Sequence, residues 1–294
     1  MKIINRLMIS FLLLFFAAAL AFGDAKIGIT GAVNWETLEL NARVSLDLEA
    51  AGIRIPVGRA HGERLINNEY LRLIRPNILN LQVDSSTTIG DLVASGHLSL
   101  LDVETFALQA DRIPPALSPD LRNMSSSYTI CLRRISTALL RHTRPMEVMR
   151  TLTPVSTANY TGIIIIATES LPVHGMIGTA LAAPSLFPRI WDTNMNLIFE
   201  RNMLDLSAPA MVRYATAESI FRRTPSGLSP ELSALVGERP LRIFARGVFG
   251  SSPTDLIIDH ADALRIISTA ENRSLLTQGR VAIIVDDSVL TSTF

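Results

Sequence analysis

Apolar and polar residues alternate without a break from Leu38 to Glu49, with the apolar side chains at the even positions. This period of two predicts a long β-strand that buries one face and exposes the other. Gly52, Pro56 and Gly58 follow closely and end the pattern. The N-terminal half therefore contains a strand with one side against a core.

Between Arg59 and Gln82 the apolar residues recur at helical spacing, which predicts a helix. Pro76 should end or kink that helix near Arg75, because proline lacks the N–H group that a helix interior needs. Alternation over residues 78–83 predicts a strand next.

The rest of the N-terminal half gives weaker patterns. The expected elements are a turn at 84–88 whose hydroxyls cap a short helix at 89–94, a helix or a strand at 98–110, a loop at Pro114-Pro115 and Ser118-Pro119, and a strand at 127–135. In the last of these, Tyr128, Ile130 and Leu132 share one face.

The second half is organised around the run Tyr160-Thr161-Gly162-Ile163-Ile164-Ile165-Ile166-Ala167. Four consecutive β-branched residues favour a strand over a helix, and unbroken apolarity indicates that both faces of the strand are covered. Gly162 marks a bulge or a close approach of another backbone. A core strand is the main interpretation, and a strand that lines a ligand site is the alternative.

Strands and helices alternate irregularly after this run. The expected elements are a hairpin of 185–191 with 197–200, a short helix at 217–223, strands at 240–248 and 255–258, a helix at 261–268 capped by Asp259, and a final strand at 280–286. Mixed strands and helices in both halves predict an α+β fold.

The chain of 294 residues is long enough for about two domains. Hydrophobic residues make up 48% of it and charged residues 18%, which excludes global disorder. We expect a signal peptide at 1–23, an N-terminal α+β domain at 24–141, a linker at 142–158, and a β-rich α+β domain at 159–294.

The N-terminus predicts export. Lys2 and Arg6 precede an apolar run over residues 7–22, and the small residues Ala21 and Gly23 suit cleavage before Asp24. An uncleaved anchor is the alternative, although the run is short for a membrane span. No cysteine follows the run, so lipidation is not expected. The predicted location is periplasmic or secreted.

Cys131 is the only cysteine, so an internal disulfide is impossible. Its position in a predicted strand favours a small buried residue, with a reactive thiol or an intermolecular disulfide as the alternatives. The formal net charge is zero, which excludes the electrostatic footprint of a nucleic-acid-binding protein.

Short catalytic motifs are absent from the sequence. It contains no Gly-x-Ser-x-Gly elbow, phosphate loop or Gly-x-Gly-x-x-Gly, and no two of its histidines are three or four positions apart. The histidines are His61, His97, His142, His174 and His260. We therefore expect no catalytic residue, no metal, no cofactor and no small-molecule substrate.

The strongest acidic cluster is Asp255, Asp259 and Asp262, which could hold a hard cation such as Ca²⁺. The competing interpretation is structural, because Asp259 and Asp262 suit a helix start. The other acidic candidates, which we interpret as helix-end or surface charges, are Asp91, Asp102, Glu104, Asp286 and Asp287.

Arg189, Arg242 and Arg246 flank apolar strands, and we expect them to pair with carboxylates rather than to bind an anion. Trp35 and Trp191 lie on predicted strands, where a core or interface role is favoured over a ligand platform.

Several blocks resemble known exported bacterial proteins of unassigned function. In the second half these are Tyr160 to Ile165, Ser185 to Ile190, Arg239 to Ala245, Thr254 to Ile258 and Asp262 to Ile266. The N-terminal half, from Val33-Asn34-Trp35 to Val83-Asp84-Ser85, resembles the envelope lipoproteins that include flagellar assembly protein P and protein T.

The resemblance implies a non-enzymatic envelope protein that supports assembly of a periplasmic or cell-surface structure, including the flagellum. Its expected partners are other envelope proteins and further copies of itself through strand edges. The alternative is a periplasmic small-molecule-binding protein or hydrolase, whose dispersed site would combine His174, Arg189, Asp255 and Asp259.

Overall fold

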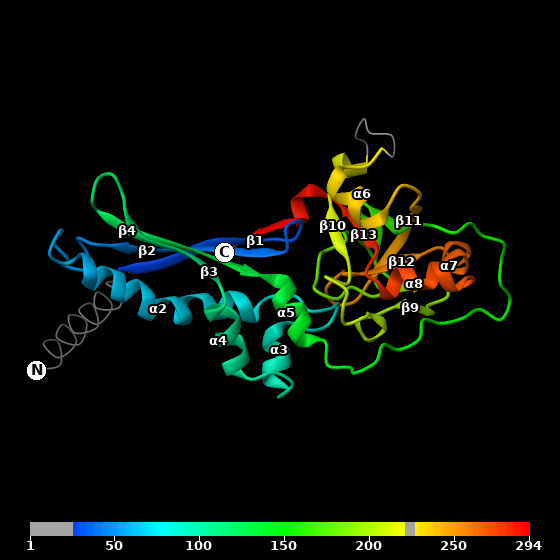
Figure 1. The fold of residues 1–294 in the computed structure, drawn as a ribbon, viewed down its shortest axis with the longest axis horizontal. Helices are drawn as coiled ribbons and strands as arrows, with labels where there is room; N and C mark the ends of the chain where they lie inside the picture. The colour runs from blue at the N-terminus through cyan, green and yellow to red at the C-terminus, as the bar shows by residue number, and fades with distance from the viewer. Residues whose placement is uncertain (1–25, 221–226) are drawn as a thin grey trace, which may run out of the picture.

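The computed structural model describes residues 26–220 and 227–294, which form two layered domains side by side (Figure 1). The predicted signal peptide at 1–23 lies outside the described residues. Strands and helices occur in irregular order in both domains, so the predicted α+β class is confirmed.

The first domain is built on an antiparallel sheet of five strands in the order β14-β1-β2-β4-β3. The strands are β1 (Ile27–Asn34), β2 (Glu39–Asp47), β3 (Asp111–Leu117), β4 (Asn123–Cys131) and β14 (Thr291–Thr293). The alternation predicted for β2 is confirmed, since the buried residues are Leu40, Ala42, Val44 and Leu46.

Helix α2 (Arg59–Leu79) packs on the apolar face of this sheet through a buried stripe of Ile66, Tyr70, Ile74 and Ile78. Tyr70 stacks on Tyr128 of β4 with ring centroids 3.7 Å apart. The other face of the sheet carries the polar side chains of β2 and β4 and has no helix on it (Figure 1).

Pro76 was predicted to end or kink the helix near Arg75, and the structure rules out the first of these, because Pro76 lies inside α2. Only three helical residues follow Pro76, and the missing N–H removes a single bond in the last turn. The strand predicted at 78–83 is also wrong. Ile78 and Leu79 complete the helix, and only Gln82 forms an isolated bridge, with Thr88.

Two short helices follow, α3 (Ile89–Ala94) and α4 (Leu100–Leu108), and both begin with a capping box. Thr88 pairs with Asp91 in the first, and Ser99 pairs with Asp102 in the second. The predicted cap at 84–88 is therefore confirmed, and the undecided segment 98–110 is helical.

Pro114 and Pro115 lie within strand β3 instead of a loop, which corrects the prediction. β3 forms the edge of the sheet, and its pairing with β4 shifts between Ile113 and Ala116. An edge strand tolerates proline because the side that faces away from the sheet needs no N–H group.

The strand predicted at 127–135 is too long, because β4 ends at Cys131 and α5 (Leu132–Leu139) begins at once. Leu132, Ile135 and Leu139 are all buried and have helical spacing. The chain then runs without helix or strand from 140 to 162.

The second domain has a mixed sheet of seven strands in the order β10-β13-β5-β11-β12-β8-β9. The strands are β5 (Ile163–Ala167), β8 (Ile190–Asp192), β9 (Leu197–Phe199), β10 (Arg213–Ala215), β11 (Leu241–Phe249), β12 (Asp255–Ile258) and β13 (Val281–Val285). Strands β10, β13, β5 and β11 run parallel to one another, and the pairs β11–β12 and β8–β9 are antiparallel.

Strand β5 is buried on both faces, as its four isoleucines predict. Ile163 and Ile165 belong to the main core, whereas Ile164 packs in a second cluster with residues of α6 (Pro230–Val236). The close approach predicted at Gly162 is confirmed, because a Cβ there would lie 2.5 Å from the Cα of Val236.

Most of the other elements expected of the second half are confirmed. These are the hairpin β8–β9, the strands β11, β12 and β13, and α7 (His260–Ile267), which Asp259 caps. The predicted helix at 217–223 is a 3₁₀ turn over Ala217–Ile220, and its remainder lies outside the described residues.

The elements that the sequence patterns missed are β1, β10, α6, α8 (Ala270–Thr277), the small hairpin of β6 (Leu171–Pro172) with β7 (Thr179–Ala180), the 3₁₀ turns at Arg201–Met203 and Asp287–Val289, and β14. β14 belongs by sequence to the expected domain at 159–294, but it pairs with β1 of the first domain. Within the described ranges, no helix is both long and apolar enough to span a bilayer.

Candidate functional site

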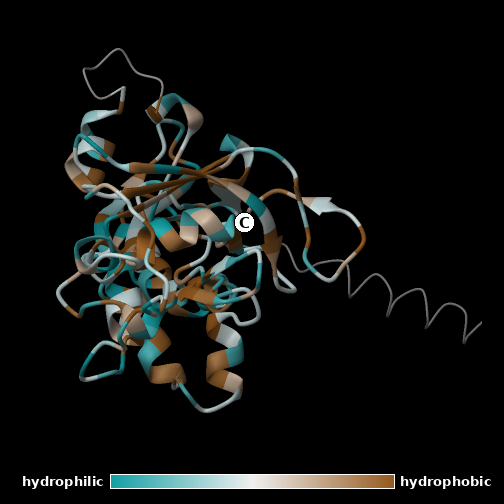
Figure 2. Cartoon of the chain, turned by 90° about the vertical axis from the view of Figure 1, so that its right-hand side faces the viewer, coloured by the Kyte–Doolittle hydropathy of each residue, from teal (hydrophilic) through white to brown (hydrophobic). Residues whose placement is uncertain are grey.

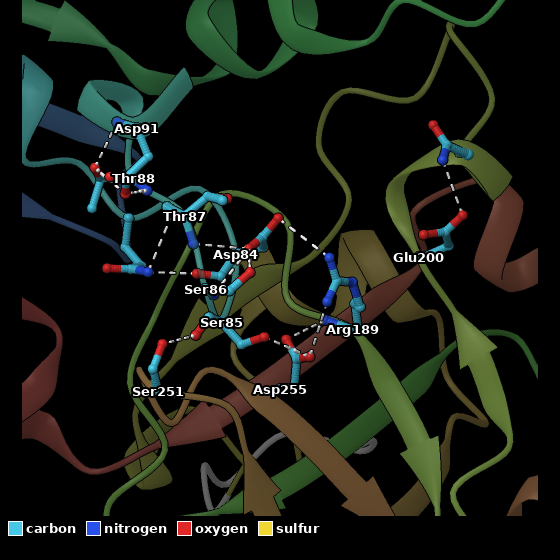
Figure 3. Close-up of polar contacts among 12 residues, drawn as sticks. Asp84, Ser85, Ser86, Thr87, Thr88, Asp91, Arg189, Glu200, Ser251 and Asp255 are labelled. Carbon is cyan, nitrogen blue, oxygen red and sulfur yellow. Dashed lines mark hydrogen bonds and ion pairs between the residues drawn. The ribbon is translucent and has the colours of Figure 1, made fainter. Parts of the chain in front are cut away.

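The two domains meet where residues 82–86 of the first enter between two segments of the second. Leu186 and Phe187 donate their backbone N–H groups to the carbonyls of Gln82 and Val83, at 3.0 and 2.8 Å. On the other side, Ser252 N–H donates to the carbonyl of Ser85 at 3.0 Å. We call this contact between the domains the junction, and Figure 3 shows its polar groups.

Asp255, the first residue of β12, lies at the centre of the junction and has no exposed surface. Its carboxylate accepts hydrogen bonds from Ser85 Oγ at 2.9 Å, from the backbone N–H of Arg189 at 3.0 Å, and from Trp191 Nε1 at 3.2 Å. Burial raises the pKa of Asp255 above its ordinary value, and these donors and the Arg189 charge oppose that rise. The carboxylate therefore joins residues of both domains.

Asp84 lies on the other side of the Arg189 guanidinium (Figure 3). Arg189 Nη2 donates to Asp84 Oδ2 at 3.4 Å, and its Nη1 lies 3.8 Å from Asp255 Oδ2. Burial alone would raise the pKa of Asp84. Hydrogen bonds from Ser86 and Thr87, together with the Arg189 charge, outweigh burial, so the pKa lies below its ordinary value.

Backbone packing closes the junction. Gly250 has φ +109°, and a Cβ at this position would lie 2.3 Å from Ser85 Cβ. A second contact between the domains is the edge-on pair of Trp35 and Tyr214, with ring centroids 6.2 Å apart. Trp35 is thus a buried interface residue, the role that the sequence favoured for it, but it lies in the turn after β1 and not on a strand.

The dispersed site that the alternative function requires does not assemble. Arg189 and Asp255 do meet, but Asp255 is sealed from solvent in the junction and cannot reach a substrate. His174 is exposed and packs on Phe249, which also packs on Trp191, so it makes no contact with Asp255 itself. Asp259 caps α7. Sequence reasoning missed the partner of Asp255, because Ser85 lies in a turn whose hydroxyls suggested only a helix cap.

The carboxylates of the proposed cation cluster have separate roles. Asp259 accepts the N–H of Ala261 as the cap of α7 and lies 3.7 Å from Arg246. Asp262 pairs with Arg265. In the part of the chain that the structure describes, no three His, Cys, Asp or Glu side chains are placed to hold a metal ion together.

The pairing expected of the strand arginines is confirmed at Arg189 and Arg246. Arg242 lies exposed on β11. The acidic residues interpreted as helix-end or surface charges have those roles: Asp91, Asp102 and Asp286 cap helical turns, Glu104 pairs with Arg75, and Asp287 is exposed.

The histidines are dispersed over the molecule. His260 Nδ1 lies 2.7 Å from the buried carboxylate of Asp192, and His142 Nε2 lies 2.8 Å from the carbonyl oxygen of Leu204. His97 contacts Ser95, and His61 is exposed on α2.

Cys131 is half-buried at the end of β4, so the prediction of a fully buried residue in mid-strand is wrong. Burial would raise the pKa of its thiol. Hydrogen bonds from the Arg133 side chain and from the backbone N–H groups of Arg133 and Arg134 outweigh burial, so the thiol pKa is below its ordinary value.

An open groove lies between α4 and α5, with a volume of about 530 Å³. Its apolar residues are Leu98, Phe106 and Ala138. Three arginines of its lining are exposed, namely Arg133, Arg134 and Arg141, against a single acidic residue, Asp102. We call this the α4/α5 groove.

Exposed leucines extend the apolar surface of the α4/α5 groove. Leu101 and Leu108 of α4 are 71% and 69% exposed, and each lies one helical turn from Thr105, which lines the groove. The two lowest helices in Figure 2, which Figure 1 identifies as α3 and α4, carry such apolar residues among polar ones. Arginine and large apolar residues are both common in protein–protein interfaces.

Comparison with protein-family models finds two successive matches. Residues 26–138 match the model of the Treponema pallidum Tp0624 N-terminal domain, and residues 162–287 match the model of the second domain of Tp0624. No curated protein matches the chain. The two matches support a two-domain architecture.

Proposed function

We propose that this chain, which carries the N-terminal and second domains of the Tp0624 family in succession, is an exported envelope protein that acts by binding other proteins and not by catalysis. The observation that carries the proposal is the α4/α5 groove with its arginine rim. The exposed leucines Leu101 and Leu108 lie beside the groove and add apolar surface that a partner can cover.

The groove suits an amphipathic helix with acidic residues along one side. Ala138 is exposed and offers an apolar contact for the apolar stripe of such a helix, and Arg133 and Arg141 can pair with its carboxylates. Arg134 has a structural role as well, because its guanidinium donates to the carbonyl of Gln109 at 2.8 Å and links α5 to the end of α4. The groove walls are therefore held in place before a partner binds.

The junction supports a scaffolding role in the same way. Asp255, Ser85 and Arg189 hold the domains together through buried, charge-assisted hydrogen bonds. A partner that binds the first domain is thereby held at a set distance from the second. This property is useful in an assembly protein, which has to position its partners.

Export is part of the proposal and rests on the N-terminal sequence. Lys2 and Arg6, the apolar run and the small residues before Asp24 favour delivery across the inner membrane. The resemblance of the N-terminal half to flagellar proteins P and T extends the proposal to the flagellum. A strain that lacks the gene should show a defect in the envelope or in motility.

The binding proposal is tested with two synthetic amphipathic helices of equal length, one of leucine and glutamate and the other of leucine and lysine. Fluorescence anisotropy should show binding of the acidic peptide to the purified chain and none of the basic peptide. The variant R133E/R141E should no longer bind the acidic peptide. Arg43→Glu, on the exposed polar face of β2, is the matched control and should retain it.

Equal binding of both peptides, or none of either, would contradict the proposed site. Turnover of a small substrate by the purified chain would contradict the non-enzymatic function. In cells, the R133E/R141E gene should fail to complement the deletion strain, and the Arg43→Glu gene should complement it.

A further inference from the structure

Strand β1 has a partly open edge. β14 pairs only with Ala32, Val33 and Asn34, and the backbone of Phe294 bonds that of Gly31. Figure 1 shows β14, in red, ending part-way along β1. The segment from Ile27 to Thr30 is paired with β2 on one side only.

The free hydrogen-bonding groups on this segment belong to Ile27 and Ile29. Gly31 exchanges both of its backbone bonds with Phe294, at 3.2 and 3.0 Å, so odd-numbered residues of β1 point their N–H and C=O groups outward. Lys26, at an even position, directs its carbonyl to the N–H of Asp47 on the opposite side. Within the described residues, Ile27 and Ile29 have no backbone partner on the outer edge.

The opposite edge of the same sheet is protected. β3 carries Pro114 and Pro115 and a shift in register, both of which prevent a further strand from pairing. The open part of β1 contains no proline and no charged residue. Ile27 and Ile29 lie on the α2 face of the sheet and are only half-buried there. The edge is therefore both unpaired and apolar.

We propose that a second copy of this chain adds its own β1 to this edge, antiparallel and across a two-fold axis at Gly28. In this register Ile27 of each copy pairs with Ile29 of the other, which forms four main-chain hydrogen bonds. Gly28 then lies opposite Gly28 of the second copy, in a non-hydrogen-bonded pair with Cα atoms about 4.5 Å apart. Phe294 already holds the backbone groups of Gly31, so the added strand pairs only from Lys26 to Thr30 and its chain turns away before Lys26.

The self-complementary register favours a second copy over an unrelated segment. The two residues with free backbone groups are both isoleucine, so each copy offers the other the same groups and the same apolar side chains. Nothing lies within 4 Å of a Cβ built on Gly28, so a side chain introduced at the axis fits the folded monomer. The inference names a partner for the proposed binding function, but it rests on different residues from the α4/α5 groove.

Analytical ultracentrifugation of the chain from residue 24 onward tests the inference. The parent chain should show a monomer–dimer equilibrium. Gly28→Glu and Gly28→Lys should each raise the dissociation constant by roughly fivefold, because like charges would face each other across the axis. Mixing the two variants should restore a dimer, since opposite charges then meet.

Two further variants complete the test. Ile29→Pro removes an outward N–H and should weaken the dimer without a loss of the monomer's own ladder, because proline is tolerated on an open edge. Ile113→Glu, exposed at the protected edge, should leave the equilibrium unchanged. A chain that stays monomeric at all concentrations would overturn the inference. A dimer whose dissociation constant is the same in the parent chain and in both Gly28 variants would overturn it as well. Neither result would affect peptide binding in the groove, so the two proposals fail separately.

Discussion

Ser85 of the first domain donates its hydroxyl to the carboxylate of Asp255 in the second domain, across 2.9 Å and out of contact with solvent. The two residues are 170 positions apart in the chain. This bond and the Arg189 guanidinium join the two family domains directly.

Loss of either partner should destabilise the fold. Ser85→Ala should lower the free energy of unfolding by about 2 kcal/mol, because a hydrogen bond to a charged group is lost. Asp255→Ala should lower it by about 3 kcal/mol, since it leaves the buried side of Arg189 and the indole of Trp191 without their acceptor.

Urea unfolding of both variants and of the double variant measures these values as a cycle. The double variant should lose less than the sum of the single variants. Ser288→Ala removes an exposed bond to Asp286 and is the control, with an expected change within about 0.5 kcal/mol. Purely additive losses at Ser85 and Asp255 would show that the two residues are not coupled.

Gly250→Ala should open the junction. A methyl group there would overlap Ser85, and φ +109° is unfavourable for any residue with a side chain. Gly96→Ala is the matched control, because it also has a positive φ but open space around it. Gly96→Ala should lower the free energy of unfolding by about 1 kcal/mol. Gly250→Ala should lower it by clearly more.

Small-angle scattering should show a larger radius of gyration for Gly250→Ala than for Gly96→Ala. Equal radii and equal stabilities would mean that the junction adapts to the methyl group.

Asp84 and Asp255 should give stability opposite dependences on pH. The pKa of Asp84 is held below that of the unfolded chain, about 3.9, so its contribution is present above that pH and is lost as the pH falls through the folded pKa. The pKa of Asp255 is raised by burial, so stability declines as the pH rises from about 4 through its folded pKa.

Asp84→Asn should therefore flatten the loss of stability in acid, and Asp255→Asn should flatten the decline at higher pH. Urea midpoints measured across the acid range to neutrality give both slopes. Variant curves that run parallel to the parent curve would contradict both assignments.

The lowered pKa of the Cys131 thiol predicts reactivity in the folded protein. A maleimide should label it faster than a free thiol of ordinary pKa near neutral pH. Arg133→Gln should slow labelling, because it removes the side-chain donor. Arg134→Gln is the control and should leave the labelling rate unchanged, since Arg134 acts through its backbone N–H. Equal rates in the two variants would contradict this cause.

Local patterns predicted many elements correctly. The alternation of β2, the cap at Thr88, the cap of α7 at Asp259 and the doubly covered strand β5 follow from residues close together in the sequence. The errors arose where tertiary position overrode local preference. Pro114 and Pro115 are acceptable in β3 because it is an edge strand. Pro76 stays inside α2, where Ile74 before it and Ile78 after it are both buried in the core.

The sequence by itself determined the α+β class, the capping residues and the buried central strand, because side-chain periodicity and caps act within a few residues. Only the tertiary structure decided that Asp255 meets Ser85, that β14 returns to pair with β1, and that β1 keeps an open edge. A periodic pattern shows which face of an element is buried, but it does not show what covers that face. Contacts between distant residues depend on how the domains pack, and that packing leaves no local signal in the sequence.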